Sequence, residues 1–97
     1  MKTKVYNELA IEFLKEDIPE EVLFTGLASE VGEVLSERKI ELLYDVNRDT
    51  LIKDELGDVL WFITAIAHQR GYTLKDLMVT NIAKLEDRLL NPKKVEE

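Results

Sequence analysis

The segment IKDELGDVLWFITAIA (residues 52–67) organises the chain, because it joins an acidic motif to a long apolar run. Its tetrad ELGD, at residues 55–58, has the order acid, apolar residue, glycine, acid. The same order occurs earlier in the tetrad EVGE, at residues 30–33. With 20 acids and 4 glycines among 97 residues, two chance copies of this pattern are improbable. The repeat therefore calls for a physical reason.

In a helix, residues three apart lie on one face, so each tetrad directs two carboxylates the same way. Like charges this close raise each other's pKa and cost stability unless a cation lies between them. A glycine inside a helix adds a cost of about 1 kcal/mol relative to alanine. We therefore expect another helix, or a ligand at a metal site, to come close to the backbone at Gly32 and Gly57.

Length and composition restrict the class of protein. The 97 residues suffice for one domain with one core, and 45% of them are hydrophobic. No apolar run approaches the roughly 20 residues of a membrane span, and no signal peptide is visible at the N-terminus. The absence of cysteine excludes disulfides and thiolate metal sites and is compatible with a cytoplasmic location. A net charge of −7 argues against nonspecific nucleic-acid binding but allows a phosphate ligand that arrives with Mg²⁺.

Helical periodicity and capping signals predict four helices and no strands. The first helix should cover residues 4–15, and the second should run from Asp17-Ile18-Pro19 to residue 37 or 39, with residues 40–44 either continuing it or forming a turn. A loop is expected at residues 45–50, and the third helix should end at residue 69 or 70, before Gly71. The fourth should begin at Thr73, whose spacing to Asp76 predicts a capping box, and stop at Asn91-Pro92.

These elements predict an all-α fold, a single domain of the four-helix bundle type that covers residues 1–97 with a frayed tail at 91–97. The third helix is apolar nearly all round after Asp58, so it should be the most buried element. The fourth helix should contribute an apolar stripe to the core. Its members are Leu74, Leu77, Met78, Ile82, Leu85 and Leu89.

The acids of the two tetrads, Glu30, Glu33, Glu55 and Asp58, are the candidate site. They could be solvated helix faces of an acidic protein, but the glycines and the apolar surroundings of the second tetrad favour one shared metal site. Four carboxylates without a histidine in register suit Mg²⁺ or Mn²⁺. A ferritin-like di-iron site would need Glu-x-x-His pairs, and the single histidine, His68, lies ten residues beyond Asp58.

Other polar and aromatic residues are candidates for substrate binding. Asn81, Lys84 and Arg88 share one stripe of the fourth helix, where they form either an anion clamp or plain surface charge. Lys53 is a further candidate phosphate contact. Trp61 should pack in the core, with stacking on a nucleobase as the alternative role.

The paired motif resembles the signature of MazG-type nucleotide pyrophosphohydrolases, members of the all-α NTP pyrophosphatase superfamily. The strings at residues 26–34 and 53–61 resemble the short, single-domain branch of that family, and the segment at residues 81–85 adds a weaker match. The family's fuller pattern often places another glutamate immediately before the first motif acid, where this chain has Ser29.

This resemblance implies metal-dependent hydrolysis of a (d)NTP to the (d)NMP and pyrophosphate, in the service of nucleotide-pool house-cleaning. It also implies a homo-oligomer, a dimer or tetramer, in the cytoplasm. The four acids would hold the metal and the catalytic water, and Asn81, Lys84 and Arg88 would hold phosphate oxygens. The alternative is a non-catalytic helical dimerisation module with a structural cation site.

Overall fold

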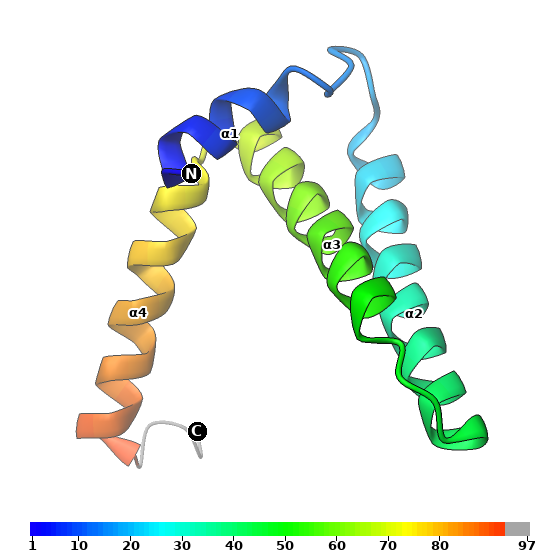
Figure 1. The fold of residues 1–97 in the computed structure, drawn as a ribbon. Helices are drawn as coiled ribbons and strands as arrows, with labels where there is room; N and C mark the ends of the chain where they lie inside the picture. Colours follow the sequence, from blue (N-terminus) through cyan, green and yellow to red (C-terminus); the bar gives the residue numbers. More distant parts are fainter. Residues whose placement is uncertain (93–97) are drawn as a thin grey trace.

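The structure, a computed structural model, describes residues 1–92 as four α-helices without a strand (Figure 1). This arrangement confirms the all-α prediction. The helices are α1 (Thr3–Ile11), α2 (Glu20–Tyr44), α3 (Asp49–Gln69) and α4 (Leu74–Leu90). The long helices α2 and α3 form an antiparallel hairpin, α1 crosses its open end, and α4 extends away from it (Figure 1). The expected tail beyond residue 92 lies outside the described residues.

One helix end differs from the expectation, and the structure decides between the two alternatives for residues 40–44. The first helix ends at Ile11, because the amides of residues 12–14 bond to carbonyls three residues earlier and tighten the chain into a turn. The second helix continues through residues 40–44 to Tyr44. It ends there because Asp45 adopts a left-handed conformation with φ of 52°, which aspartate tolerates better than most residues.

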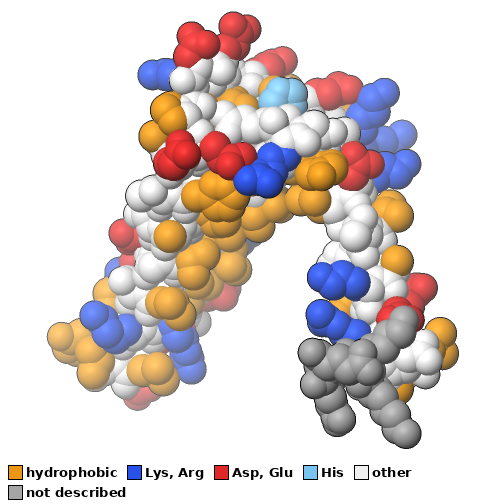
Figure 2. All heavy atoms as spheres, turned by 180° about the vertical axis from the view of Figure 1, so that it is seen from behind, with side chains coloured by type: hydrophobic (Ala, Val, Ile, Leu, Met, Phe, Trp, Pro, Cys, Tyr) orange, Lys and Arg blue, Asp and Glu red, His pale blue; other side chains and the backbone are white. Residues whose placement is uncertain are grey.

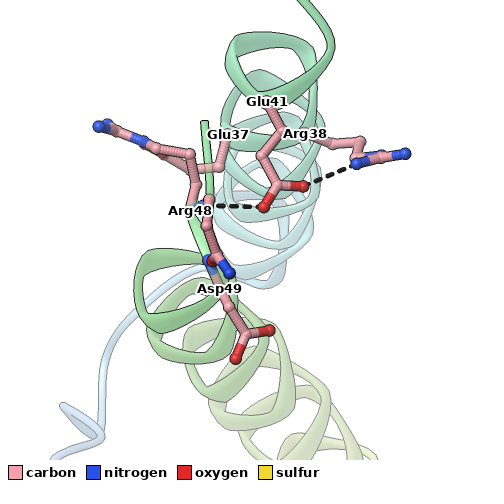
Figure 3. A network of polar contacts seen from close by, with 6 residues as sticks. Glu37, Arg38, Glu41, Arg48 and Asp49 are labelled. Carbon is pink, nitrogen blue, oxygen red and sulfur yellow. Dashed lines mark hydrogen bonds and ion pairs between the residues drawn. The ribbon is translucent and has the colours of Figure 1, made fainter. Parts of the chain in front are cut away.

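The turn between α2 and α3 is held by Arg48 (Figure 3). Its backbone N–H donates to the Glu41 carboxylate at 2.7 Å, and its Nε donates to Glu37 at 2.8 Å. Arg38 donates to the other oxygen of Glu41, so that one carboxylate ties the last turns of α2 to the loop. These bonds lower the pKa of Glu41, chiefly through the Arg48 amide. The loop thereby directs α3 back along α2.

Close packing of α2 on α3 occurs at Gly26, where a Cβ atom would overlap the ring of Phe62. Another helix does not approach Gly32 or Gly57, since no atom of the described chain comes within 4 Å of a Cβ built at either position, so that alternative of the expectation is wrong. Both glycines follow their motif acids by two residues and point away from the contact between the helices. Gly26 and Phe62 therefore set the separation of the helices one turn away from the acidic motifs.

The open end of the hairpin is tied to α1 and its following loop. The indole Nε1 of Trp61 donates to the carbonyl of Ala10 at 3.0 Å, and Gln69 donates to the carbonyl of Ile18 at 2.8 Å. Arg70 forms two bonds to Glu20, of 2.7 and 2.9 Å. The buried residues of α3, Thr64, Ala65 and Ala67, lie at this end, and no other described helix has as many, which confirms α3 as the most buried element.

The connection from α3 to α4 follows the predicted signals. Gly71, with φ of 83°, ends α3 in a Schellman motif, in which the amides of Tyr72 and Gly71 bond to the carbonyls of Ala67 and His68. Thr73 and Asp76 form the predicted capping box at the start of α4. The Asn7 side chain also accepts the amide of Leu74, which joins α1 to this turn.

Beyond its first turns, α4 leaves the rest of the molecule. It contacts α1 and α3, but no contact joins the described parts of α4 and α2. The expected core stripe is therefore wrong after Leu74 and Leu77, because four of its residues are largely exposed within one chain. Their exposed fractions are 46% for Met78, 55% for Ile82, 47% for Leu85 and 82% for Leu89.

Candidate metal centre

Three motif acids converge where α2 and α3 face each other. Glu30 comes from α2, and Glu55 and Asp58 come from α3. One carboxylate oxygen of each lies within 4.8 Å of the others. Glu30 and Glu55 are half-buried between the helices, and Asp58 is exposed at the edge. The antiparallel hairpin thus brings together acids that are 25 to 28 residues apart in the sequence.

The acids repel one another, and Glu55 shows the effect. Hydrogen bonding to the Glu30 side chain is the main reason that the pKa of Glu55 is raised. Partial burial and the charges of Glu30, Asp58 and Glu33 raise that pKa further. A bound cation would oppose these effects and favour the ionised form of Glu55.

Glu33, the fourth motif acid, lies at the margin of this group. It is exposed and is not among the three acids whose oxygens converge. Its charge still acts on Glu55, which places it in the same electrostatic environment. The structure therefore brings three of the four predicted acids into one group and leaves the fourth beside it.

The donor set fits a hard divalent cation. Mg²⁺ takes oxygen ligands at about 2.0–2.1 Å, so two ligands on opposite sides of one ion are about 4.2 Å apart. The observed limit of 4.8 Å between carboxylate oxygens is close to that span, and small side-chain rotations would close the difference. The absence of nitrogen and sulfur donors from the group favours Mg²⁺ or Mn²⁺ over softer metals.

No side-chain cation pairs with these acids among residues 1–92. The ion pairs there join Arg38 to Glu41, Arg48 to Glu37, and Arg70 to Glu20. The candidate phosphate-binding residues Asn81, Lys84 and Arg88 all belong to α4, which does not touch α2. Within one chain, the structure does not bring them to the acids. Asn81 and Lys84 instead line a hollow of about 390 Å³ together with Tyr72.

The two remaining candidates also lie apart from the converging oxygens. Lys53 is exposed and sits two residues before Glu55, about 200° around the helix axis from it. Trp61 uses its indole N–H within the chain and packs edge-on against Phe62, with ring centroids 5.0 Å apart. The described contacts of Trp61 are thus those of a packing residue.

Sequence reasoning missed the role of Gly26 as a positioning residue. It lies four residues before Glu30, and Phe62 lies four residues after Asp58, so the contact is one turn from the acids on each helix. That spacing was visible in the sequence. The signal was ambiguous because three glycines of α2 and α3 lie near the acids, and only the packing of the helices distinguishes them.

The described residues thus form an all-α protein in which carboxylates from two facing helices make a candidate cation site. Residues 19–91 match the family described as the MazG nucleotide pyrophosphohydrolase domain, and the chain belongs to that family. The match contains the hairpin and α4 and leaves out α1.

A curated protein also matches the chain. The chain is 36% identical over 70 residues to the Gene 37 protein of Mycobacterium phage L5. The match covers 65% of this chain and 60% of the phage protein, so the chain spans less than two thirds of that relative. No solved structure matches the chain significantly. None of the helices in residues 1–92 combines the length and the apolar character that a membrane crossing requires.

Proposed function

We propose that the chain is a metal-dependent nucleoside triphosphate pyrophosphohydrolase, which cleaves a (d)NTP to the (d)NMP and pyrophosphate. The observation that carries the proposal is the convergence of Glu30, Glu55 and Asp58 in a member of the MazG family. Nucleotide-pool house-cleaning in the cytoplasm is the biological role that we propose for this activity.

Glu30, Glu55 and Asp58 would hold Mg²⁺, with Mn²⁺ as a substitute. When bound, the metal supplies positive charge to the phosphates and lowers the pKa of a water molecule. A held cation would favour the ionised form of Glu55, whose pKa is raised chiefly by hydrogen bonding to Glu30.

We assign Glu33 the task of orienting the attacking water and accepting its proton. It is the motif acid that lies beside the group without joining it, and it is accessible to solvent. We expect Glu33→Gln to lower turnover strongly while Mg²⁺ binding, measured by isothermal titration calorimetry, stays near that of the parent. A variant that loses Mg²⁺ binding and turnover together would instead make Glu33 a metal ligand.

Asn81, Lys84 and Arg88 are our candidates for contacts to phosphate oxygens, with Lys53 as a weaker one. Trp61 is a candidate for stacking on the nucleobase. We also propose that the protein works as a homo-oligomer. Within residues 1–92 of one chain only five apolar residues are buried. They are Ala10, Leu23, Ala65, Ala67 and Leu74.

The direct test is pyrophosphate release from a panel of ribo- and deoxynucleoside triphosphates with Mg²⁺ or Mn²⁺. We expect metal-dependent release by the parent and its loss in Glu55→Gln. Glu21→Gln is the matched control, since it makes the same change at an exposed position of α2 outside the acidic group. Metal-dependent stability without release from any triphosphate would favour the non-catalytic module and reject the enzyme.

A further inference from the structure

The converging acids of the candidate metal centre form a small group. Glu30, Glu55 and Asp58 each offer one carboxylate oxygen, and these oxygens lie within 4.8 Å of one another. Two metal ions that share a site lie about 3.5–4 Å apart, so ligands at about 2.1 Å on their far sides would span about 8 Å. The three converging oxygens thus suit one ion and fall short of the span that two ions need.

The charge of the group leads to the same limit. Three ionised carboxylates outweigh one divalent cation, whereas two such cations would leave an excess of positive charge among them. Glu30 and Glu55 are half-buried between α2 and α3, so the packing of the helices restrains their side chains. A second ion would therefore need further carboxylates at the exposed edge of the group, where Asp58 and Glu33 lie.

Ser29 occupies a position on α2 from which such a carboxylate would come. It lies four residues before Glu33 and about 40° from it around the helix axis, so the two exposed side chains are neighbours on one face. Glu37, one turn beyond Glu33 on that face, is held by Arg48 instead. The Ser29 hydroxyl is neutral, whereas a glutamate there would form a pair of acids with Glu33. The edge thus lacks the second acid of a ligand pair.

Within one chain, no cationic side chain adds positive charge to this edge. The ion pairs of residues 1–92 do not include the motif acids. Figure 2 shows Lys and Arg side chains on α4, across a deep hollow from the hairpin. With one ion bound, the edge stays negative, because Glu33 adds its charge to the surplus of the three converging acids. The phosphates of a nucleotide are negative as well, so this edge would repel them.

We propose that each chain holds one resident divalent cation, and that the nucleotide brings the second cation as its own metal complex. Ser29 is the residue that limits the resident ions to one. This inference rests on the proposed function and specifies its substrate, which is the Mg²⁺ complex of the nucleoside triphosphate. Mg²⁺ is commonly held by one or two carboxylates together with substrate phosphates, and the exposed edge offers carboxylates of this kind at Asp58 and Glu33.

Counting bound Mn²⁺ tests the proposal without any use of activity. Electron paramagnetic resonance follows the titration, because the signal of free Mn²⁺ is lost on binding. We expect one Mn²⁺ per chain without nucleotide, and two when a triphosphate analogue with a methylene group between its α and β phosphorus atoms is bound. Two ions without nucleotide would overturn the single resident ion. An analogue that binds without a second ion, or that does not bind in excess Mn²⁺, would overturn the assignment of the substrate.

Variants at position 29 test the role of Ser29. We expect Ser29→Glu to bind two Mn²⁺ per chain without nucleotide, because it adds a carboxylate one turn from Glu33. Ser29→Gln has nearly the same shape without the charge and should stay at one. Glutamate and glutamine both favour helices, and circular dichroism checks that the helices are retained. Ser29→Asp repeats the test with a shorter acid. A count of one in both folded acidic variants would overturn the role of Ser29.

The metal count and turnover can fail separately. A parent that binds one Mn²⁺ alone and two with the analogue, yet releases no pyrophosphate from any triphosphate, would reject the proposed function and retain the metal count. Pyrophosphate release by a parent that holds two Mn²⁺ per chain without nucleotide would reject the single resident ion and retain the proposed function.

Discussion

At the scale of single residues, the electrostatics of Glu55 distinguish the candidate site from an ordinary acidic surface. Its pKa is raised, first by hydrogen bonding to Glu30 and then by partial burial and by neighbouring negative charge. Ionising such a carboxyl costs more free energy than ionising one on an ordinary acidic surface. The same arrangement favours the binding of a cation, because the cation offsets the repulsion between the carboxylates.

We predict that Glu55→Gln stabilises the metal-free protein at pH 7. A carboxyl whose pKa is higher in the folded state binds its proton more tightly there, so its contribution to stability is complete below the unfolded pKa of about 4.3. That contribution disappears as the pH rises through the raised folded pKa. The difference in unfolding free energy between variant and parent should therefore grow in favour of the variant across that window.

Urea unfolding from pH 4 to 8 in EDTA measures this difference. Glu21→Gln is the control for a change of net charge, and its difference from the parent should lack the same rise. Equal stability of Glu55→Gln and the parent at pH 7 would contradict the repulsive site.

Gly26 shows a second effect at this scale, one of close packing. We predict that Gly26→Ala lowers the unfolding free energy by about 1–3 kcal/mol, because the new methyl group overlaps the ring of Phe62. Gly32→Ala and Gly57→Ala are matched controls in open space, where a metal-free chain should gain up to about 1 kcal/mol of helix propensity. Thermal or urea unfolding of the three variants measures these differences in unfolding free energy. A Gly26→Ala variant more stable than the parent would contradict the close contact of the helices at this position.

At the scale of the element, α4 depends on its ends more than on burial. Its capping box joins the Thr73 hydroxyl to the Asp76 amide at 3.1 Å and the Asp76 carboxylate to the Thr73 amide at 2.8 Å. The second bond is the main reason that the pKa of Asp76 is lowered. A carboxyl with a lowered folded pKa stabilises the fold above its unfolded pKa, and the effect is lost as the pH falls through the folded value.

We predict that Thr73→Ala lowers the stability of α4 by about 1 kcal/mol, the usual cost of a lost N-cap. Hydrogen exchange should show faster amides in α4 and little change in the α2–α3 hairpin, because α4 has no contact with α2. Thr73→Ser preserves the hydroxyl and is the control. An equal loss of protection in both regions would mean that α4 unfolds together with the hairpin.

At the scale of the whole molecule, metal binding should be coupled to the stability of the hairpin, because the converging acids come from two helices. We predict that saturating Mg²⁺ raises the unfolding free energy of the parent by about 2.7 kcal/mol at a hundredfold excess over its dissociation constant. The gain should vanish on chelation and be absent in Asp58→Asn.

Calorimetry with and without Mg²⁺ measures this gain, and Na⁺ at equal ionic strength controls for general screening. The gain should also increase as the pH rises through the pKa of Glu55, because the ion displaces a proton there. If Mg²⁺ raised the unfolding free energy of Asp58→Asn as much as that of the parent, the metal would have to bind at another site.

The fold class, the order of the helices and most of their ends could be predicted because they depend on local chemistry. The end of α3 at Gly71 and the Thr73 capping box could be predicted from the local sequence, because backbone conformation and hydrogen bonds between near neighbours determine them. The choice of candidate acids was equally local, because a spacing of three residues places two carboxylates on one helical face.

The sequence by itself thus determined four helices, a paired acidic motif and membership of a family that the motif already resembled. Only the tertiary structure decided which acids converge, which glycine is packed, and that α4 leaves its apolar stripe uncovered. The physical reason is that helical periodicity defines faces, whereas the angle between helices decides what each face meets. Here that angle separates Lys84 and Arg88 from the acids of their own chain.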